Sequence, residues 1–104
     1  TGDLLVIGWG GTFGALVSAV NDLQEDGKKI SLAQFNYIKP LPRNTRKILE
    51  SFKKIIVVEM NAGQFVFYLR SLYQEFDFIQ YNKIQGLPFM ISELKEKFNQ
   101  ILEG

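Results

Sequence analysis

The chain is 104 residues long, 46% hydrophobic and 22% charged, which is typical of a globular domain rather than of a disordered segment. Its 12 basic and 11 acidic side chains leave a net charge of +1, which argues against nucleic acid or an anionic membrane as a partner. The absence of Cys and His excludes disulfides, thiolate-bound iron–sulfur clusters and thiolate zinc sites, and removes the commonest general base.

The first expected elements are a strand over residues 4–8 and a helix that begins near Thr12, a suitable N-cap residue. Gly27 fits the left-handed position that follows many helix ends. Apolar side chains recur at helical spacing between these two positions, at Phe13, Leu16, Val17, Val20 and Leu23.

A second strand is expected within residues 30–38, where Pro40 stops it because proline cannot donate to a sheet ladder. Asn44 can cap a short helix that runs to about Phe52. The inward side chains of this helix are expected to be Ile48, Leu49 and Phe52. Residues 55–58 are all β-branched, which predicts a strand buried on both faces at the centre of a parallel sheet.

The last part of the chain predicts a helix capped by Asn61, a strand over residues 76–81 and a final helix that begins at Ser92. The strand is more polar than the others, so we expect it near an edge of the sheet. The inner faces of the two helices are predicted to hold Phe65, Val66, Leu69 and Leu72, and Leu94, Phe98, Ile101 and Leu102.

Alternation of strands and helices predicts an α/β fold, a three-layer α/β/α domain with a mainly parallel sheet of about four or five strands. A flavodoxin-like strand order would make the first and third strands neighbours. We interpret residues 1–104 as a single domain cut from a longer polypeptide, because Thr1 stands directly before a strand. No apolar run approaches the roughly 20 residues of a membrane-spanning helix, and no signal-peptide pattern is present, so we expect a cytoplasmic protein without a membrane partner.

The glycine-rich turn after the first strand is the main candidate for ligand binding. Gly8, Gly10 and Gly14 approximate the dinucleotide fingerprint, but three residues rather than two precede the last glycine. The second strand also lacks the acidic residue that would hold a ribose. These departures favour a geometric role, a tight turn with close approach of helix and sheet. The alternative is a small anion- or nucleotide-binding module that uses the loop of residues 8–14.

Two further side chains are expected at the carboxyl edge of the sheet. Trp9 lies between glycines, where it can contact another domain or subunit or, less in keeping with residue preferences, stack on a ligand. Glu59 follows the most buried strand, and we favour a hydrogen bond that its carboxylate accepts from a helix N-terminus or from nearby loop amides. The alternatives are contact with a ligand and a receiver-like phosphoryl acceptor, although Gly8 and Trp9 occupy the place of the acidic pair that a receiver requires.

Three segments, residues 8–14, 59–64 and 82–89, are therefore expected to meet at this edge and to pack against a neighbouring domain. No catalytic residue and no metal ligand is assigned, and paired acid–base chemistry has no support. The candidate interface residues are Gly8, Trp9, Gly10, Thr12, Gly14, Glu59, Asn61, Gln64, Asn82, Lys83 and Phe89.

Four segments taken in order resemble one family. They are Gly8-Trp9-Gly10-x-Thr12-x-Gly14, Tyr37-x-x-Pro40-Leu41-Pro42, Glu59-Met60-Asn61-x-Gly63-Gln64 and Tyr81-Asn82-Lys83-x-x-Gly86-x-Pro88-Phe89. Together they resemble the C-terminal domain of the alpha subunit of 2-oxoacid:ferredoxin oxidoreductases, especially of the 2-oxoglutarate type. The resemblance covers nearly the whole chain and departs from the family at Gly11 and Phe13, which usually are Ser and Tyr.

The resemblance implies a domain like the C-terminal domain of transketolase, without the main catalytic residues. It also implies a parent enzyme that uses thiamine diphosphate, coenzyme A and iron–sulfur clusters. Such an enzyme converts a 2-oxoacid and coenzyme A to acyl-CoA and CO2, and ferredoxin takes the electrons. The expected partners are the other domains of the alpha subunit and a thiamine-binding beta subunit, and no cofactor is expected within this chain.

Overall fold

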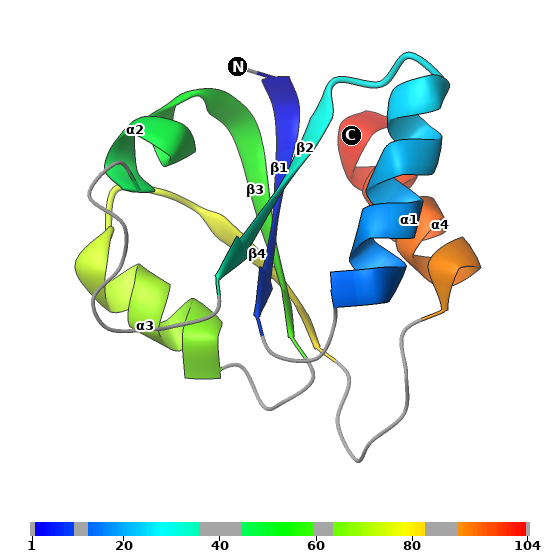
Figure 1. Ribbon diagram of the computed structural model, residues 1–104. Coiled ribbons are helices and arrows are strands. Elements are labelled where there is room, and N and C mark those ends of the chain that lie inside the picture. The colour runs from blue at the N-terminus through cyan, green and yellow to red at the C-terminus, as the bar shows by residue number, and fades with distance from the viewer. Residues whose placement is uncertain (1, 10–12, 36–44, 60–63, 83–89, 104) are drawn as a thin grey trace.

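The computed structural model describes residues 2–9, 13–35, 45–59, 64–82 and 90–103 (Figure 1). Strands and helices alternate along the chain, as the sequence predicts. The elements are β1 (Gly2–Trp9), α1 (Phe13–Glu25), β2 (Ile30–Phe35), α2 (Thr45–Glu50), β3 (Phe52–Glu59), α3 (Gln64–Leu72), β4 (Phe78–Asn82) and α4 (Ile91–Glu103). None of the described helices is long and apolar enough to cross a membrane.

The sheet has the strand order β2-β1-β3-β4, and each of its neighbouring pairs is parallel. The predicted adjacency of the first and third strands is therefore confirmed. β4 lies at one edge, as its polar composition indicated, and β2 lies at the other. Because β1 and β3 have a neighbour on each side, they form the centre of the sheet.

Helices cover both faces of the sheet, with α1 and α4 on one side and α2 and α3 on the other (Figure 1). Alternation along β1 divides its side chains between two cores, since successive residues of a strand point to opposite faces. Leu4 and Val6 pack toward α1 and α4, whereas Leu5 and Ile7 pack toward α2 and α3. The sheet is thus the middle layer of a three-layer α/β/α domain and separates its two hydrophobic cores.

β3 confirms the interpretation of its β-branched run, because residues 55–58 are each at most 3% exposed. Ile56 and Val58 belong to the core beneath α1 and α4, and Ile55 and Val57 to the core beneath α2 and α3. A strand covered on both faces needs apolar side chains at every position, and this explains the absence of alternation.

The end of α1 confirms the prediction for Gly27, whose φ is 87°. The backbone N–H of Gly27 donates to the carbonyl of Gln24 at 3.0 Å, and that of Lys28 donates to the carbonyl of Leu23 at 3.0 Å. This pair of hydrogen bonds is the Schellman motif, in which a left-handed glycine ends the helix.

Several expected boundaries and inward positions are corrected. Phe52 begins β3 instead of ending the short helix, and it packs partly buried against the core beneath α2 and α3. Phe76 precedes β4, which runs from Phe78 to Asn82, and α4 begins at Ile91 rather than Ser92. Leu72 is 47% exposed, because it is the last residue of α3.

The start of α4, one residue before the expected Ser92, is stabilised by a side chain of its own first turn. The Glu93 carboxylate accepts a hydrogen bond from the backbone N–H of Met90 at 2.8 Å. This is the backward half of a capping box, with Met90 in the N-cap position. The expected caps Asn44 and Asn61 and residues 36–38 of the second strand lie outside the described residues.

Candidate functional site

The carboxyl edge of the sheet brings together the strand ends that the sequence singled out. Trp9 of β1 is in register with Glu59 of β3, and Glu59 is in register with Asn82 of β4. Phe35 of β2 extends this row on the other side of Trp9. In open parallel sheets, ligands and partners meet the crevice beyond the carboxyl ends of the strands. This row is therefore the place where a functional surface is expected.

Glu59 is the best-defined side chain of the row. It ends β3, is 0% exposed, and its Oε2 accepts a hydrogen bond from the backbone N–H of Val66 at 3.0 Å. Val66 is the third residue of α3, so the bond is made to an amide of the first turn. Amides in the first turn lack partners within the helix, and the helix dipole favours negative charge there. The expectation that Glu59 binds a helix N-terminus is confirmed.

This contact explains how a carboxylate is kept inside the fold. A buried acidic side chain is tolerated when hydrogen-bond donors take the place of water. Glu59 follows Ile55 and Val57 on the face of β3 that α3 covers, so its carboxylate lies beneath the start of that helix. The side chain joins the end of β3 to the beginning of α3 across the connection of residues 60–63.

The described residues offer little else for acid–base or metal chemistry at this edge. No three His, Cys, Asp or Glu side chains among them gather where they could hold a metal ion. The full sequence contains neither His nor Cys. The carboxylate of Glu59 is directed into the fold, and its established contact is structural.

The glycines of the predicted loop have different roles. Gly8 is buried within β1, whereas Gly14 is exposed as the second residue of α1. A Cβ added at Gly14 would meet no atom within 4 Å. The close approach of helix and sheet predicted for the glycine-rich turn therefore does not require glycine at this position. Gly10 lies outside the described residues.

The remaining candidates are placed only in part. Trp9, Gln64 and Asn82 are described by their backbones, as the last residue of β1, the first of α3 and the last of β4. Thr12, Asn61, Lys83 and Phe89 lie outside the described residues.

Sequence reasoning did not select Phe35 or Tyr81, which also lie at or near the carboxyl edge. Phe35 was not identified as a strand end because the second strand was expected to continue past it. Tyr81 is partly buried against the core beneath α1 and α4, and Lys97 Nζ lies 5.7 Å from the centre of its ring. Beside this pair is a hollow of about 190 Å³, lined by Tyr81, Glu93, Glu96, Lys97 and Gln100.

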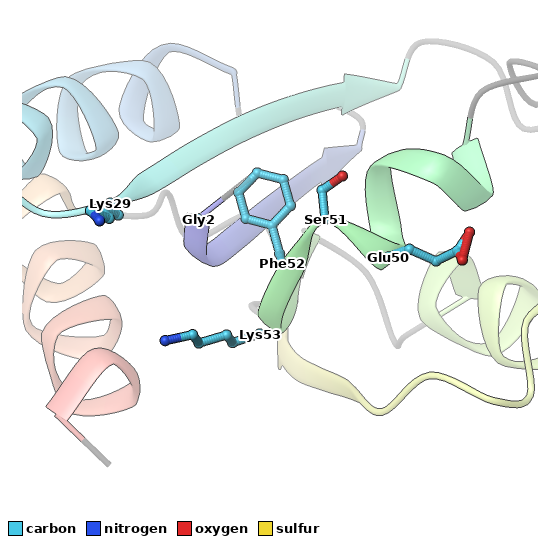
Figure 2. Close-up of a pocket in the computed structure, with 6 residues that line it drawn as sticks. All are labelled: Gly2, Lys29, Glu50, Ser51, Phe52 and Lys53. Carbon is cyan, nitrogen blue, oxygen red and sulfur yellow. The ribbon is translucent and has the colours of Figure 1, made fainter.

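A second hollow, of about 340 Å³, lies at the opposite, amino edge of the sheet (Figure 2). Its lining residues are Gly2, Lys29, Glu50, Ser51, Phe52 and Lys53. A Cβ at Gly2 would lie 2.9 Å from Phe52 Cε2 and 3.1 Å from the carbonyl oxygen of Lys29, so only glycine fits without a shift. This edge is thus closely packed at the start of β1, and it is separate from the row of strand ends.

The strand order and the row of strand ends define a parallel α/β domain, and comparison with known proteins identifies its family. The model of pyruvate:ferredoxin oxidoreductase core domain II matches residues 2–94. The chain therefore belongs to this family, as its motifs indicated.

The curated relatives are subunits of oxidoreductases. The chain is 32% identical over 106 residues to 2-oxoglutarate oxidoreductase subunit KorA of Mycobacterium tuberculosis, which covers 100% of this chain and 16% of that protein. It is 33% identical over 103 residues to the 2-oxoacid:ferredoxin oxidoreductase subunit alpha of Saccharolobus solfataricus, covering 94% of this chain and 16% of that protein. The chain thus spans about a sixth of the length of these relatives.

A solved structure supports the same relationship. The 2-oxoglutarate:ferredoxin oxidoreductase from Magnetococcus marinus, solved with 2-oxoglutarate, coenzyme A and succinyl-CoA bound, matches with a TM-score of 0.83 and 27% identity. The match covers 97% of this chain and 18% of that chain. The α/β fold predicted from sequence is confirmed.

Proposed function

We propose that this chain is a non-catalytic structural and assembly domain of a 2-oxoacid:ferredoxin oxidoreductase alpha subunit, with 2-oxoglutarate as the oxoacid. The whole enzyme would convert the 2-oxoacid and coenzyme A to acyl-CoA and CO2, and two electrons would pass to ferredoxin. Family membership and the names of the relatives support the class of enzyme. The role of this part of it rests on the chain's own residues.

The observation that carries the non-catalytic role is the contact between Glu59 and Val66. Glu59 is the one acidic residue in the described row of strand ends, and its carboxylate is buried and accepts the amide of Val66. A general base must reach a proton of the substrate, and a carboxylate directed beneath a helix cannot do so without leaving its partner. The side chain best placed for chemistry is therefore engaged in holding the fold.

We propose that the cofactors of the enzyme bind outside this chain. Iron–sulfur clusters are commonly held by cysteine thiolates, and none of the 104 residues is Cys. The anionic groups of thiamine diphosphate or coenzyme A need free donors, such as the first-turn amides of a helix. In α3 the amide of Val66 is already bonded to Glu59. The absence of Cys and the occupied amide of Val66 support the proposal that these cofactors bind elsewhere in the enzyme.

The proposed contact surface is the carboxyl edge, where Trp9, Glu59 and Asn82 lie in register. Its partners are other domains of the alpha subunit and the thiamine-binding beta subunit. Large aromatic side chains contribute most of the binding energy at many protein interfaces, so Trp9 is the residue to test.

The test uses the full alpha subunit with its partner subunit, as wild type, Trp9→Ala and Leu72→Ala. Leu72→Ala is the control, because Leu72 is an exposed apolar residue at the far end of α3. We expect Trp9→Ala to weaken assembly about tenfold or more, as for an interface hot spot, and Leu72→Ala to leave it unchanged. Assembly is measured by analytical ultracentrifugation, and normal assembly and activity of Trp9→Ala would contradict the proposal.

Calorimetric titration of the 104-residue chain distinguishes this role from an anion-binding module. Coenzyme A, thiamine diphosphate and NAD are titrated separately, and we expect no heat of binding at micromolar concentrations. Micromolar affinity for any of them would overturn the non-catalytic role and favour a ligand site in the loop of residues 8–14.

A further inference from the structure

The two edge strands lack the residue types that often protect an edge strand. β2 reads Ile-Ser-Leu-Ala-Gln-Phe and β4 reads Phe-Ile-Gln-Tyr-Asn, so neither contains Lys, Arg or Pro. Such residues commonly prevent an edge strand from pairing with a strand of another molecule, because its outer N–H and C=O groups are a ready template. In these two strands, protection has to come from elsewhere in the fold.

At the β2 edge, Gln24 supplies a donor. Its Nε2 donates a hydrogen bond to the backbone carbonyl of Ile30 at 2.7 Å. The preceding carbonyl, that of Lys29, accepts the backbone N–H of Leu4 in the neighbouring strand at 3.2 Å. Because carbonyl directions alternate along a strand, the carbonyl of Ile30 faces the outer side of β2. Gln24 therefore occupies the first acceptor that a pairing strand would use.

At the β4 edge, Arg70 is the donor to the first residue of the strand, as Gln24 is at the β2 edge. Its Nη2 donates to the backbone carbonyl of Phe78 at 2.8 Å, and its Nη1 lies 3.5 Å from Gln80 Oε1. A hollow of about 370 Å³ borders this edge, lined by Arg70, Gln74, Phe76, Asp77 and Phe78. The guanidinium thus lies over the start of the strand, where an incoming backbone would have to enter.

The two contacts share one geometry. In each, the donor stands in the last turn of a helix, and the acceptor is the first residue of the edge strand that follows that helix. Gln24 precedes Ile30 by 6 residues and Arg70 precedes Phe78 by 8. Independent occurrence at both outer strands indicates a function of the edges rather than a chance surface contact.

We propose that Gln24 and Arg70 close the outer edges of β2 and β4 against pairing with the same strand of a second copy of this chain. Two copies related by a two-fold axis would join identical edges in antiparallel fashion, which extends the sheet across the dimer. The covering side chain must be displaced before the strand can pair. We expect Arg70 to oppose pairing more strongly than Gln24, because a charged, planar guanidinium makes stronger hydrogen bonds than a neutral amide.

The test replaces each donor by methionine, which keeps an unbranched side chain but cannot donate. Arg70→Met and Gln24→Met are compared with Arg46→Met and Gln100→Met, which make the same exchange on exposed faces of α2 and α4. Arg46 pairs with Glu75 and lies 5.2 Å from the centre of the Tyr73 ring, away from the strand backbone. The mass in solution is measured by light scattering over a range of protein concentrations.

We expect the self-association constant of Arg70→Met to rise about tenfold over that of Arg46→Met, which corresponds to about 1.4 kcal/mol and lies within the range of a net hydrogen bond. Gln24→Met should show a smaller rise over Gln100→Met. Hydrogen exchange should slow at β4 amides in the associated form, and adding Gln80→Lys to Arg70→Met should restore the monomer. Association no greater than in the controls, or association without protection of β4, would overturn the proposal.

Discussion

The carboxylate of Glu59 accepts a hydrogen bond from the backbone N–H of Val66 at 3.0 Å, and this bond joins β3, one of the two central strands, to the first turn of the helix α3. Both residues are at most 1% exposed. A charged group at the carboxyl edge of a parallel sheet is an obvious candidate for catalysis. Here it stabilises the edge by joining the end of β3 to the start of α3.

Removing this carboxylate should destabilise the domain more than removing its charge alone. Glu59→Ala leaves the buried amide of Val66 without this acceptor, and we expect the free energy of unfolding to fall by about 2 kcal/mol. Glu59→Gln keeps an acceptor of the same shape, so its loss should be smaller. Urea denaturation of the 104-residue chain measures both values, and equal stability of Glu59→Ala and wild type would contradict the structural role.

The stability of the chain should respond with opposite signs to alanine at the two glycines near the ends of α1. Gly14→Ala should stabilise the chain by about 0.5 kcal/mol, because the new methyl group meets nothing within 4 Å and alanine favours the helix. Gly27→Ala should destabilise it by about 1 kcal/mol, because the φ of 87° is strained for any residue with a Cβ.

Thermal and urea unfolding of both glycine variants provide the measurement. The two substitutions make the same chemical change near the two ends of one helix, so each is the control for the other. A loss of stability in Gly14→Ala would show that this position is more confined than its surroundings indicate.

Lys54 should stabilise the end of α4. Its Nζ donates to the backbone carbonyl of Ile101 at 2.7 Å, where the negative end of the helix dipole favours a cation. We expect Lys54→Met to lower the free energy of unfolding by about 1 kcal/mol and to speed hydrogen exchange in the last turn of α4.

The matched control for Lys54 is its neighbour Lys53. The Lys53 side chain is 81% exposed, and its Nζ lies 3.4 Å from Asp3 Oδ1. Lys53→Met should change stability by less than about 0.5 kcal/mol, as for other exposed ion pairs. Similar effects of the two substitutions would mean that the contact with Ile101 contributes nothing specific.

Much of the fold followed from local patterns. The continuous β-branched run of residues 55–58 predicted a strand covered on both faces, and Gly27 marked the end of the first helix. The position of Glu59 after that run also predicted its contact with a helix N-terminus. These features could be predicted from the sequence because each depends on the type of a residue and on its immediate neighbours.

Other features had no local signal. Phe52 is apolar at a helical spacing from Ile48 and Leu49, yet it begins β3, where it pairs with Gly2 of β1. Leu72 fits the apolar face of α3, but the helix ends there and leaves it 47% exposed. In both cases the pattern was ambiguous, and pairing with a distant strand or the end of the supporting surface decided the outcome.

By itself, the sequence determined the alternation of strands and helices, the buried centre of the sheet and the family to which the chain belongs. Only the tertiary structure decided what the polar side chains do, as when Glu59 meets Val66, Arg70 meets the Phe78 carbonyl and Lys54 meets Ile101. Burial of apolar residues follows a periodicity that one segment carries alone, since the hydrophobic effect has no direction. A hydrogen bond needs two groups in a specific orientation, and the strand register and helix packing that bring them together are properties of the whole fold.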